Sequence, residues 1–78
     1  MTKIYVSFGQ IHSCVTTKKS GGYVTLDRNC IAVLKCETYE KGREIIVKIT
    51  NNMFHNCWSE KEWKEEWLKY FPRGLIEI

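Results

Sequence analysis

The chain has 78 residues, 44% of them hydrophobic and 13% aromatic, and a net charge of +3. This length allows one domain, residues 1–78, and the composition excludes a disordered chain. The small positive charge does not by itself indicate a nucleic-acid-binding protein, and no apolar run is long enough to span a membrane. The first residues lack the pattern of a signal peptide, so we expect a cytoplasmic protein whose four cysteines are free thiols.

The first half of the chain predicts a series of strands. Alternating β-branched and aromatic residues indicate strands at residues 3–8 and 23–26, and the stretch HSCVTT continues the extended pattern after Gly9. The sequence KKSGG at residues 18–22 is a strong turn signal. The apolar run CIAVLKC at residues 30–36 is almost unbroken and predicts the central strand.

Residues 38–50, TYEKGREIIVKIT, are compatible with two structures. In a hairpin, EKGR would form the turn and REIIVKIT a strand. In a helix, Thr38 would be the N-cap and the two Asn residues at 51–52 would end it. We favour the helix, whose apolar face would carry Gly42, Ile45, Ile46 and Ile49. The stretch MFHNCW would then be a short strand.

A C-terminal helix is the clearest predicted element. Ser59 and Glu62 have the spacing of a capping box, and Trp58 and Trp63 have the spacing of a hydrophobic staple. One apolar stripe follows at helical spacing: Trp63, Trp67, Tyr70 and Phe71. Pro72 ends this helix, and LIEI would close the chain as a strand.

These elements predict an α+β fold in a small single domain. We expect a mostly antiparallel sheet, covered on one face by the amphipathic C-terminal helix and by the second helix at residues 38–50. An exposed edge strand could pair with a second copy and form a homodimer.

His and Cys residues at close spacing suggest a metal site as one alternative. Residues two apart on a strand face the same side, so two neighbouring strands could assemble a zinc site from His12, Cys14, His55 and Cys57. The simpler interpretation is that the cysteines are buried and inert. A catalytic pair of Cys14 or Cys57 with either His lacks electropositive surroundings, so we expect no enzymatic activity and no cofactor.

Other polar residues are candidates for binding. Lys18 and Lys19 in a hairpin tip, with Tyr23 and Arg28 nearby, could contact phosphate in a weak nucleic-acid interaction. Arg73 is held between Pro72 and Gly74, which suits a carboxylate or anion anchor, although a helix stop with a surface Arg explains the same residues.

The motifs FGQIH near the N-terminus and YFPRGLIEI at the C-terminus resemble a family of small proteins encoded by bacteriophages and prophages. The family's D-x-x-C element is matched by Asp27 and Cys30, and its GRE element by residues 42–44. The family has a second His where this chain has Cys14, so an exact transfer of ligand residues is not supported. The resemblance favours the helix at residues 38–50 and implies a phage accessory role, without an established activity.

We therefore expect a non-catalytic, phage-encoded protein that acts in the host cytoplasm. Its partner would be a host protein or nucleoprotein complex, such as a CRISPR-type defence complex. On this hypothesis Gln10 and His12 belong to the contact surface, and Arg73 is a charged anchor. A small-ligand or zinc-binding domain centred on His12 and Cys14 is the alternative from another class.

Overall fold

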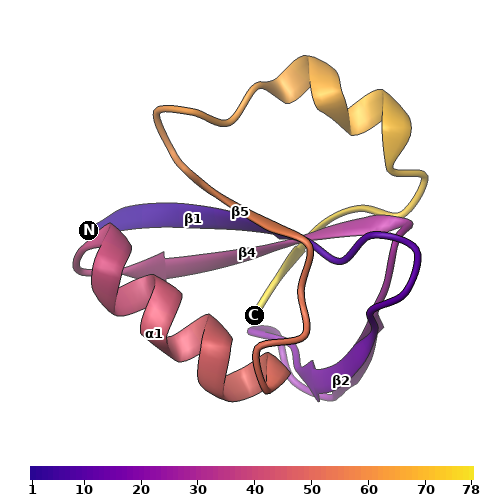
Figure 1. Ribbon diagram of the computed structural model, residues 1–78, viewed down its shortest axis with the longest axis horizontal. Coiled ribbons are helices and arrows are strands. Elements are labelled where there is room, and N and C mark those ends of the chain that lie inside the picture. The colour runs from indigo at the N-terminus through magenta and orange to yellow at the C-terminus, as the bar shows by residue number, and fades with distance from the viewer.

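The computed structural model describes all residues 1–78 (Figure 1). The sheet at its centre has four strands in the order β5-β1-β4-β6. A separate two-stranded hairpin is formed by β2 and β3. The elements in chain order are β1 (Thr2–Ser7), β2 (Cys14–Thr17), β3 (Tyr23–Leu26), β4 (Cys30–Cys36), α1 (Tyr39–Thr50), β5 (Asn56–Ser59), the 3₁₀ helix η1 (Glu65–Tyr70) and β6 (Gly74–Glu77).

The two inner strands, β1 and β4, are among the most apolar stretches of the chain. β1 pairs antiparallel with both β4 and β5, whereas β4 pairs parallel with β6. The predicted central position of the strand at residues 30–36 is therefore confirmed. The sheet is mostly antiparallel, and the mixed α and β content agrees with the predicted fold class.

Side chains alternate along a strand, so β1 and β4 bury apolar residues on both faces of the sheet. Figure 1 shows α1 and η1 on opposite sides of these strands. Our prediction that the helix at residues 38–50 and the C-terminal segment cover the same face is wrong. The face below α1 and the β2–β3 hairpin contains Ile4, Val6, Phe8, Leu26, Cys30, Ala32, Cys36, Ile46 and Cys57. The other face contains Tyr5, Ile31, Val33 and Trp63.

Residues 38–50 contain the predicted helix, so the hairpin alternative is wrong. Thr38 has an extended backbone, and its hydroxyl oxygen accepts a hydrogen bond of 3.2 Å from the Lys41 N–H. At the other end Asn51 adopts a left-handed conformation with φ of 54°, and its N–H donates to the Val47 carbonyl. Local capping signals therefore set both ends of α1.

Gly42, Ile46 and Thr50 form the buried ridge of α1 at a spacing of four residues. The backbone of Gly42 approaches the sheet so closely that an added Cβ would lie 2.5 Å from Cys36 Sγ and 3.0 Å from Ile4 Cδ1. The glycine is therefore required by packing, in a helix that would otherwise favour alanine.

The structure contains no helix with both the length and the apolar character needed to cross a membrane.

The predicted α-helix at residues 59–71 does not form. The capping box itself is present, because the Ser59 N–H donates to Glu62 Oε1 at 3.1 Å and the Glu62 N–H donates to Ser59 Oγ at 3.2 Å. The turn does not continue as an α-helix, since Lys64 has extended backbone angles of −122° and 124°. A short 3₁₀ helix, η1, follows in place of the predicted helix.

Packing of three tryptophans explains why the local helix signals are overridden. Trp63 stacks on Tyr5 of the sheet with ring centroids 4.9 Å apart and an interplanar angle of 6°. Trp58, on β5, tilts against Trp63 at 5.7 Å and against Trp67 at 5.5 Å. Burying aromatic rings of this size contributes more free energy than a few helical hydrogen bonds do. The chain therefore bends to bring the rings onto the sheet.

Replacing Gly42 with alanine tests the close approach of α1. We expect Gly42→Ala to lower the free energy of unfolding by about 1–3 kcal/mol through overpacking, although helix propensity alone favours alanine by about 1 kcal/mol. Urea denaturation measures the change. Adding Cys36→Ala to this variant should recover part of the loss, because it removes the sulfur that the new methyl group meets. If Gly42→Ala alone were as stable as the parent, the close approach of α1 to the sheet would not restrict this position. Glu44→Ala, on the exposed side of α1, is the control.

Candidate functional site

The stretch FGQIHSC leads from the core to the surface. Phe8 is fully buried beyond the end of β1, and Cys14 begins β2. Gly9 has a positive φ of 65°, and an added Cβ would lie 3.1 Å from the Cβ of His55. Glycine is needed there both for its conformation and for the contact with His55. The intervening residues form a surface loop, so the extended pattern predicted for HSCVTT is a strand only from Cys14 to Thr17.

This loop and the β3–β4 turn line a polar pocket of about 330 Å³, here called the loop pocket. Three of the predicted binding residues, Gln10, His12 and Arg28, line this pocket, and the fold brings Arg28 to the loop that carries the other two. The Nδ1 atom of His12 is buried and has no hydrogen-bond partner, so a ligand in the pocket could reach only the Nε2 edge of the ring. The lining residues are Gly9, Gln10, Ile11, His12, Ser13, Asp27, Arg28 and Asn29.

Arg73 supports the loop pocket from behind and does not line it. Its guanidinium donates to the Thr25 carbonyl at 2.6 Å and forms an ion pair with Asp27 at 3.2 Å. Its backbone N–H donates to the Asn29 carbonyl at 2.8 Å, and Asp27 accepts a further bond of 2.9 Å from the Asn29 N–H. The guanidinium of Arg73, which we predicted to be held rigidly, therefore binds groups of its own chain. These contacts fix the turn that carries Arg28.

The outward side of the β2–β3 hairpin carries apolar side chains that the fold does not cover. Tyr23 is 81% exposed and Val15 is 64% exposed. The pairing of Val15 with Thr25 and of Thr17 with Tyr23 makes Val15 and Tyr23 diagonal neighbours on this side. Ile11, in the loop pocket, is 84% exposed. We call these residues the hairpin surface: Ile11, Val15, Thr17, Tyr23 and Thr25.

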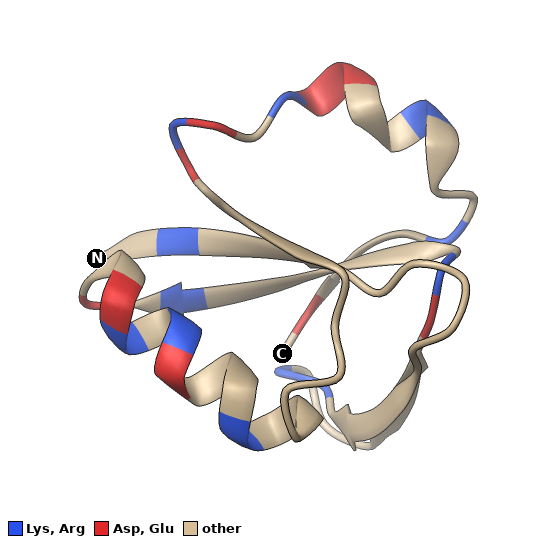
Figure 2. Ribbon diagram, viewed as in Figure 1, with Lys and Arg blue, Asp and Glu red and all other residues tan.

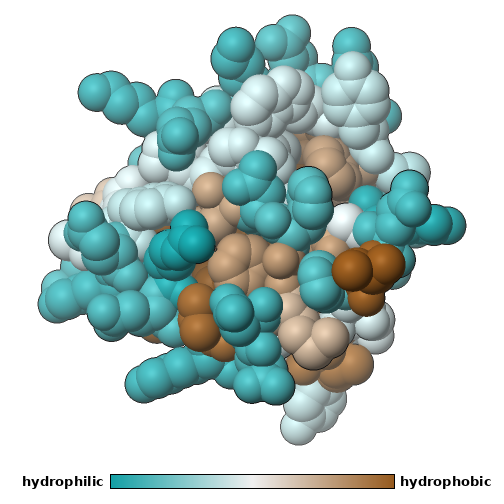
Figure 3. Space-filling model, in the orientation of Figure 1, coloured by the Kyte–Doolittle hydropathy of each residue, from teal (hydrophilic) through white to brown (hydrophobic).

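Apolar side chains also stand out in the space-filling view. In Figure 3 strongly hydrophobic atoms protrude between hydrophilic ones at the right, over the loop after β1, and paler apolar atoms lie at the lower right, over the hairpin; another strongly hydrophobic group lies at the lower left, over α1. Of the hairpin surface, only Tyr23 was named from the sequence, as a neighbour of the hairpin lysines, and an apolar binding surface was not predicted. The signal was present, because CVTT and YVTL place apolar residues at both odd and even positions, and a hairpin lying on a core can bury only one of its two sides.

Lys18 and Lys19 lie at the opposite end of the hairpin from the loop pocket. The turn is closed by a 2.9 Å bond from the Lys18 N–H to the Gly22 carbonyl, and the Lys19 N–H donates to the Glu77 carbonyl of β6 at 3.0 Å. The two lysines do not belong to a larger basic patch. Figure 2 shows Lys and Arg mixed with Asp and Glu along α1 and along the segment that contains η1.

The four residues of the predicted zinc site are not assembled. No group of three or more His, Cys, Asp or Glu side chains is close enough to hold a metal ion. The prediction required the strand with His12 and Cys14 to lie beside the strand with His55 and Cys57. Instead, β5 pairs only with β1, and β2 belongs to the separate hairpin.

The cysteines are poor candidates for nucleophiles at neutral pH. Burial raises the pKa of each thiol above its ordinary value, so the thiols stay protonated. Cys30, Cys36 and Cys57 belong to the buried core, and Cys14 packs against it half-buried. All four are free thiols in the structure. Their placement agrees with inert packing.

No family model, curated protein or solved structure matches this chain. Function is therefore inferred from the arrangement of its own side chains. The loop pocket and the hairpin surface share Ile11 and form one candidate binding region on the segment between Gly9 and Asn29.

Alkaline pH should destabilise the protein. Desolvation by burial raises the folded-state pKa of the four thiols and of the Tyr39 hydroxyl. Their stabilising effect is complete below the unfolded pKa and is lost as pH rises through the folded pKa. We expect the free energy of unfolding to fall above about pH 8.5, where free thiols begin to ionise. Urea titrations between pH 7 and 10.5 measure this, and Cys36→Ala should show a shallower fall. A flat profile up to pH 10 would contradict the burial of the thiols.

A double-mutant cycle tests whether Arg73 is structural. Both side chains of the Arg73–Asp27 pair are about one-third exposed, so solvent screening limits the coupling to about 0.5–1 kcal/mol. Arg73→Gln should destabilise by about 1–2 kcal/mol in total, because the bond to the Thr25 carbonyl is also lost. Arg28→Gln, which removes no such contact, is the matched control. If Arg73→Gln and Arg28→Gln were equally stable, Arg73 would have no structural role and its guanidinium would be free to bind a ligand.

Proposed function

We propose that this chain is a non-catalytic binding protein that recognises a protein partner through the hairpin surface and the loop pocket. The resemblance to phage-encoded proteins suggests a partner in the bacterial host, such as a component of a defence complex of the CRISPR type. One observation supports the proposal most: Ile11, Val15 and Tyr23 expose large apolar side chains within one short segment, beside a pocket lined by polar groups.

The chemistry of this region is typical of protein interfaces. An exposed tyrosine offers a large contact area with a hydroxyl at its edge, and Tyr and Arg are among the residues that most often dominate binding energy. Tyr23 and Arg28 fill those roles at the two ends of β3. Gln10 and His12 add hydrogen-bonding groups that could select one partner over others. The rigid support that Arg73 gives to the β3–β4 turn lowers the entropy lost on binding.

The alternatives receive less support. A zinc-binding domain would need ligands that converge, and His12, Cys14, His55 and Cys57 do not form such a group. A nucleic-acid binder would need a basic stripe, whereas the two lysines of the hairpin tip share one pocket with Glu77 and have no other basic residue among its lining. Apolar side chains at the centre of the exposed region favour a protein surface over a phosphate backbone.

Surface variants test the proposal. The tagged protein and its Tyr23→Ser and Ile11→Ser variants are used to capture proteins from bacterial lysate, and the retained protein is then purified for calorimetry. We expect each variant to weaken binding of that protein at least tenfold. Truncating a central interface residue usually costs more than about 1.4 kcal/mol of binding free energy, which is a factor of ten in affinity. Thermal unfolding should be nearly unchanged, because both side chains are exposed.

Tyr70→Ser is the matched control, since Tyr70 is also an exposed tyrosine but lies in η1 on the other side of the sheet. Binding that is weakened equally by Tyr70→Ser, or by none of the three substitutions, would exclude the hairpin surface as the contact. Capture of no protein from any bacterial host lysate would contradict the proposed function itself.

A further inference from the structure

The two edges of the central sheet differ in how they are closed. On the outer edge of β5, the Cys57 N–H donates to the side chain of Asn56 at 2.8 Å, and the Cys57 carbonyl accepts a bond of 3.2 Å from the Tyr39 hydroxyl. Side chains of the same chain thus occupy the peptide groups that another strand would need. An edge protected in this way does not accept a further strand.

The outer edge of β6 is open at its centre. The Ile78 N–H donates to the Val33 carbonyl at 3.0 Å, so the peptide groups of Ile78 and, two residues earlier, Ile76 face β4. The peptide groups of Leu75 and Glu77 therefore face away from the sheet. Only the Glu77 carbonyl has a partner there, the N–H of Lys19. The Leu75 N–H and carbonyl and the Glu77 N–H are left without one.

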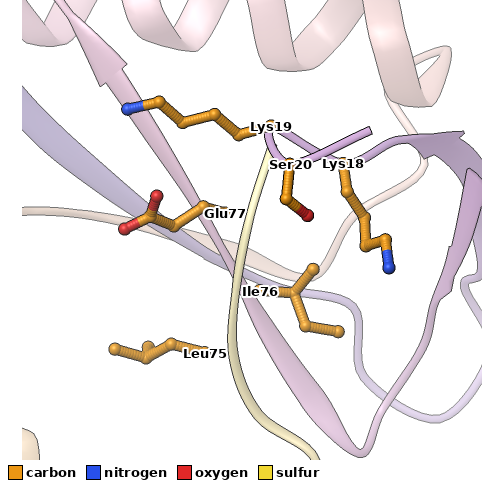
Figure 4. Close-up of a pocket in the computed structure, with 6 residues that line it drawn as sticks. All are labelled: Lys18, Lys19, Ser20, Leu75, Ile76 and Glu77. Atoms are coloured by element: carbon orange, nitrogen blue, oxygen red, sulfur yellow. The ribbon is translucent and has the colours of Figure 1, made fainter. Parts of the chain in front are cut away.

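A pocket of about 380 Å³, here called the edge pocket, adjoins these free groups. It lies between β6 and the tip of the hairpin and is lined by Lys18, Lys19, Ser20, Leu75, Ile76 and Glu77 (Figure 4). Its volume suits two or three residues of extended chain. The hairpin tip closes the pocket at the Glu77 end, so a segment pairing with β6 must be short.

The side chains around the edge pocket separate by chemistry. Figure 4 shows Lys18, Ser20 and Ile76 on one side of β6 and Lys19, Leu75 and Glu77 on the other. On the first side an ammonium and a hydroxyl have no carboxylate among the lining residues. On the second side the charges of Lys19 and Glu77 are balanced, and Leu75 is 40% exposed.

We propose that β6 receives a short extended segment of a protein partner, which adds as a further strand and carries an acidic residue between two apolar residues. Alternate side chains of a strand point to opposite sides. The acidic residue would then meet Lys18 and Ser20, while its two apolar neighbours would meet Leu75. Backbone hydrogen bonds to Leu75 and Glu77 would supply affinity, and the side chains would supply selectivity.

The inference deepens the proposed function, because it names the kind of segment that a partner offers. It is tested without that partner, so the two can fail separately. The probe is the peptide acetyl-Thr-Val-Glu-Val-Thr-amide, added to the full ¹⁵N-labelled chain and followed by NMR. We expect amide shifts at Leu75, Glu77 and Ser20 that saturate, and no comparable shifts at Cys57 on the protected edge.

Four comparisons make the test specific. The peptide with Lys in place of Glu should bind more weakly, and so should the Glu peptide with the Lys18→Gln variant, by about two- to fivefold as for an exposed ion pair. Lys64→Gln, an exposed lysine outside the pocket, is the matched control and should bind as the parent does. A peptide N-methylated at alternate amides should lose binding when the methylated amides face β6 and keep it when they face away. Only one edge of the added strand pairs with β6.

Several results would overturn the inference. Absence of shifts at Leu75 and Ser20 at millimolar peptide would mean that the edge does not accept a strand. Equal binding of the Glu and Lys peptides would remove the role of Lys18. Shifts of the same amides with protein concentration alone would show that β6 pairs with β6 of a second copy instead. Loss of binding by Tyr23→Ser in the lysate experiment bears only on the hairpin surface and leaves this result unaffected.

Discussion

The antiparallel pair of β1 and β4 is the constraint on which the structure depends. Both strands are apolar on both sides, and each lies between two other strands of the sheet. Such a pair must be covered on two faces, because an uncovered face would expose a row of branched side chains to water. The chain provides α1 for one face and the three tryptophans for the other. The close approach at Gly42 and the stacking of Trp63 on Tyr5 both follow from this requirement.

In so short a chain, these two covers leave little apolar material for anything else. The β2–β3 hairpin extends the layer of α1 with its inward side, which carries Val24 and Leu26, but no element covers its outward side. Only one of the two sheet edges is protected by hydrogen bonds from side chains. The exposed Tyr23 and the open edge at Leu75 are therefore two of the places where the chain presents groups that its own fold does not use.

The same hairpin connects these two places. Arg73, which precedes β6, holds the carbonyl of Thr25 at the end of β3, and Glu77, at the end of β6, holds the backbone of Lys19 at the hairpin tip. Two contacts between distant parts of the chain thus set the position of the hairpin against β6. Binding in the loop pocket and binding at the edge pocket would both act on a segment held at its two ends.

Local residues were sufficient to predict the elements whose ends depend on capping or turn chemistry. Thr38 and Asn51 set the limits of α1, KKSGG formed the predicted turn, and residues 30–36 became the central strand. The C-terminal helix failed because the same aromatic residues that fit a helical stripe gain more by packing on the sheet. Gln10 and His12 were predicted together from one stretch of sequence and Arg28 from another, and only the loop geometry brought all three into one pocket.

The sequence by itself determined the α+β composition, α1 with its two caps and the apolar strands of the sheet, because these depend on residues close together in the chain. The tertiary structure alone decided which face each cover occupies, that Arg73 binds Asp27 and Thr25, that β5 lies beside β1 and away from β2, and which sheet edge stays open. These features depend on strand order and on contacts between residues more than 40 positions apart. No pattern within a short window of sequence specifies them.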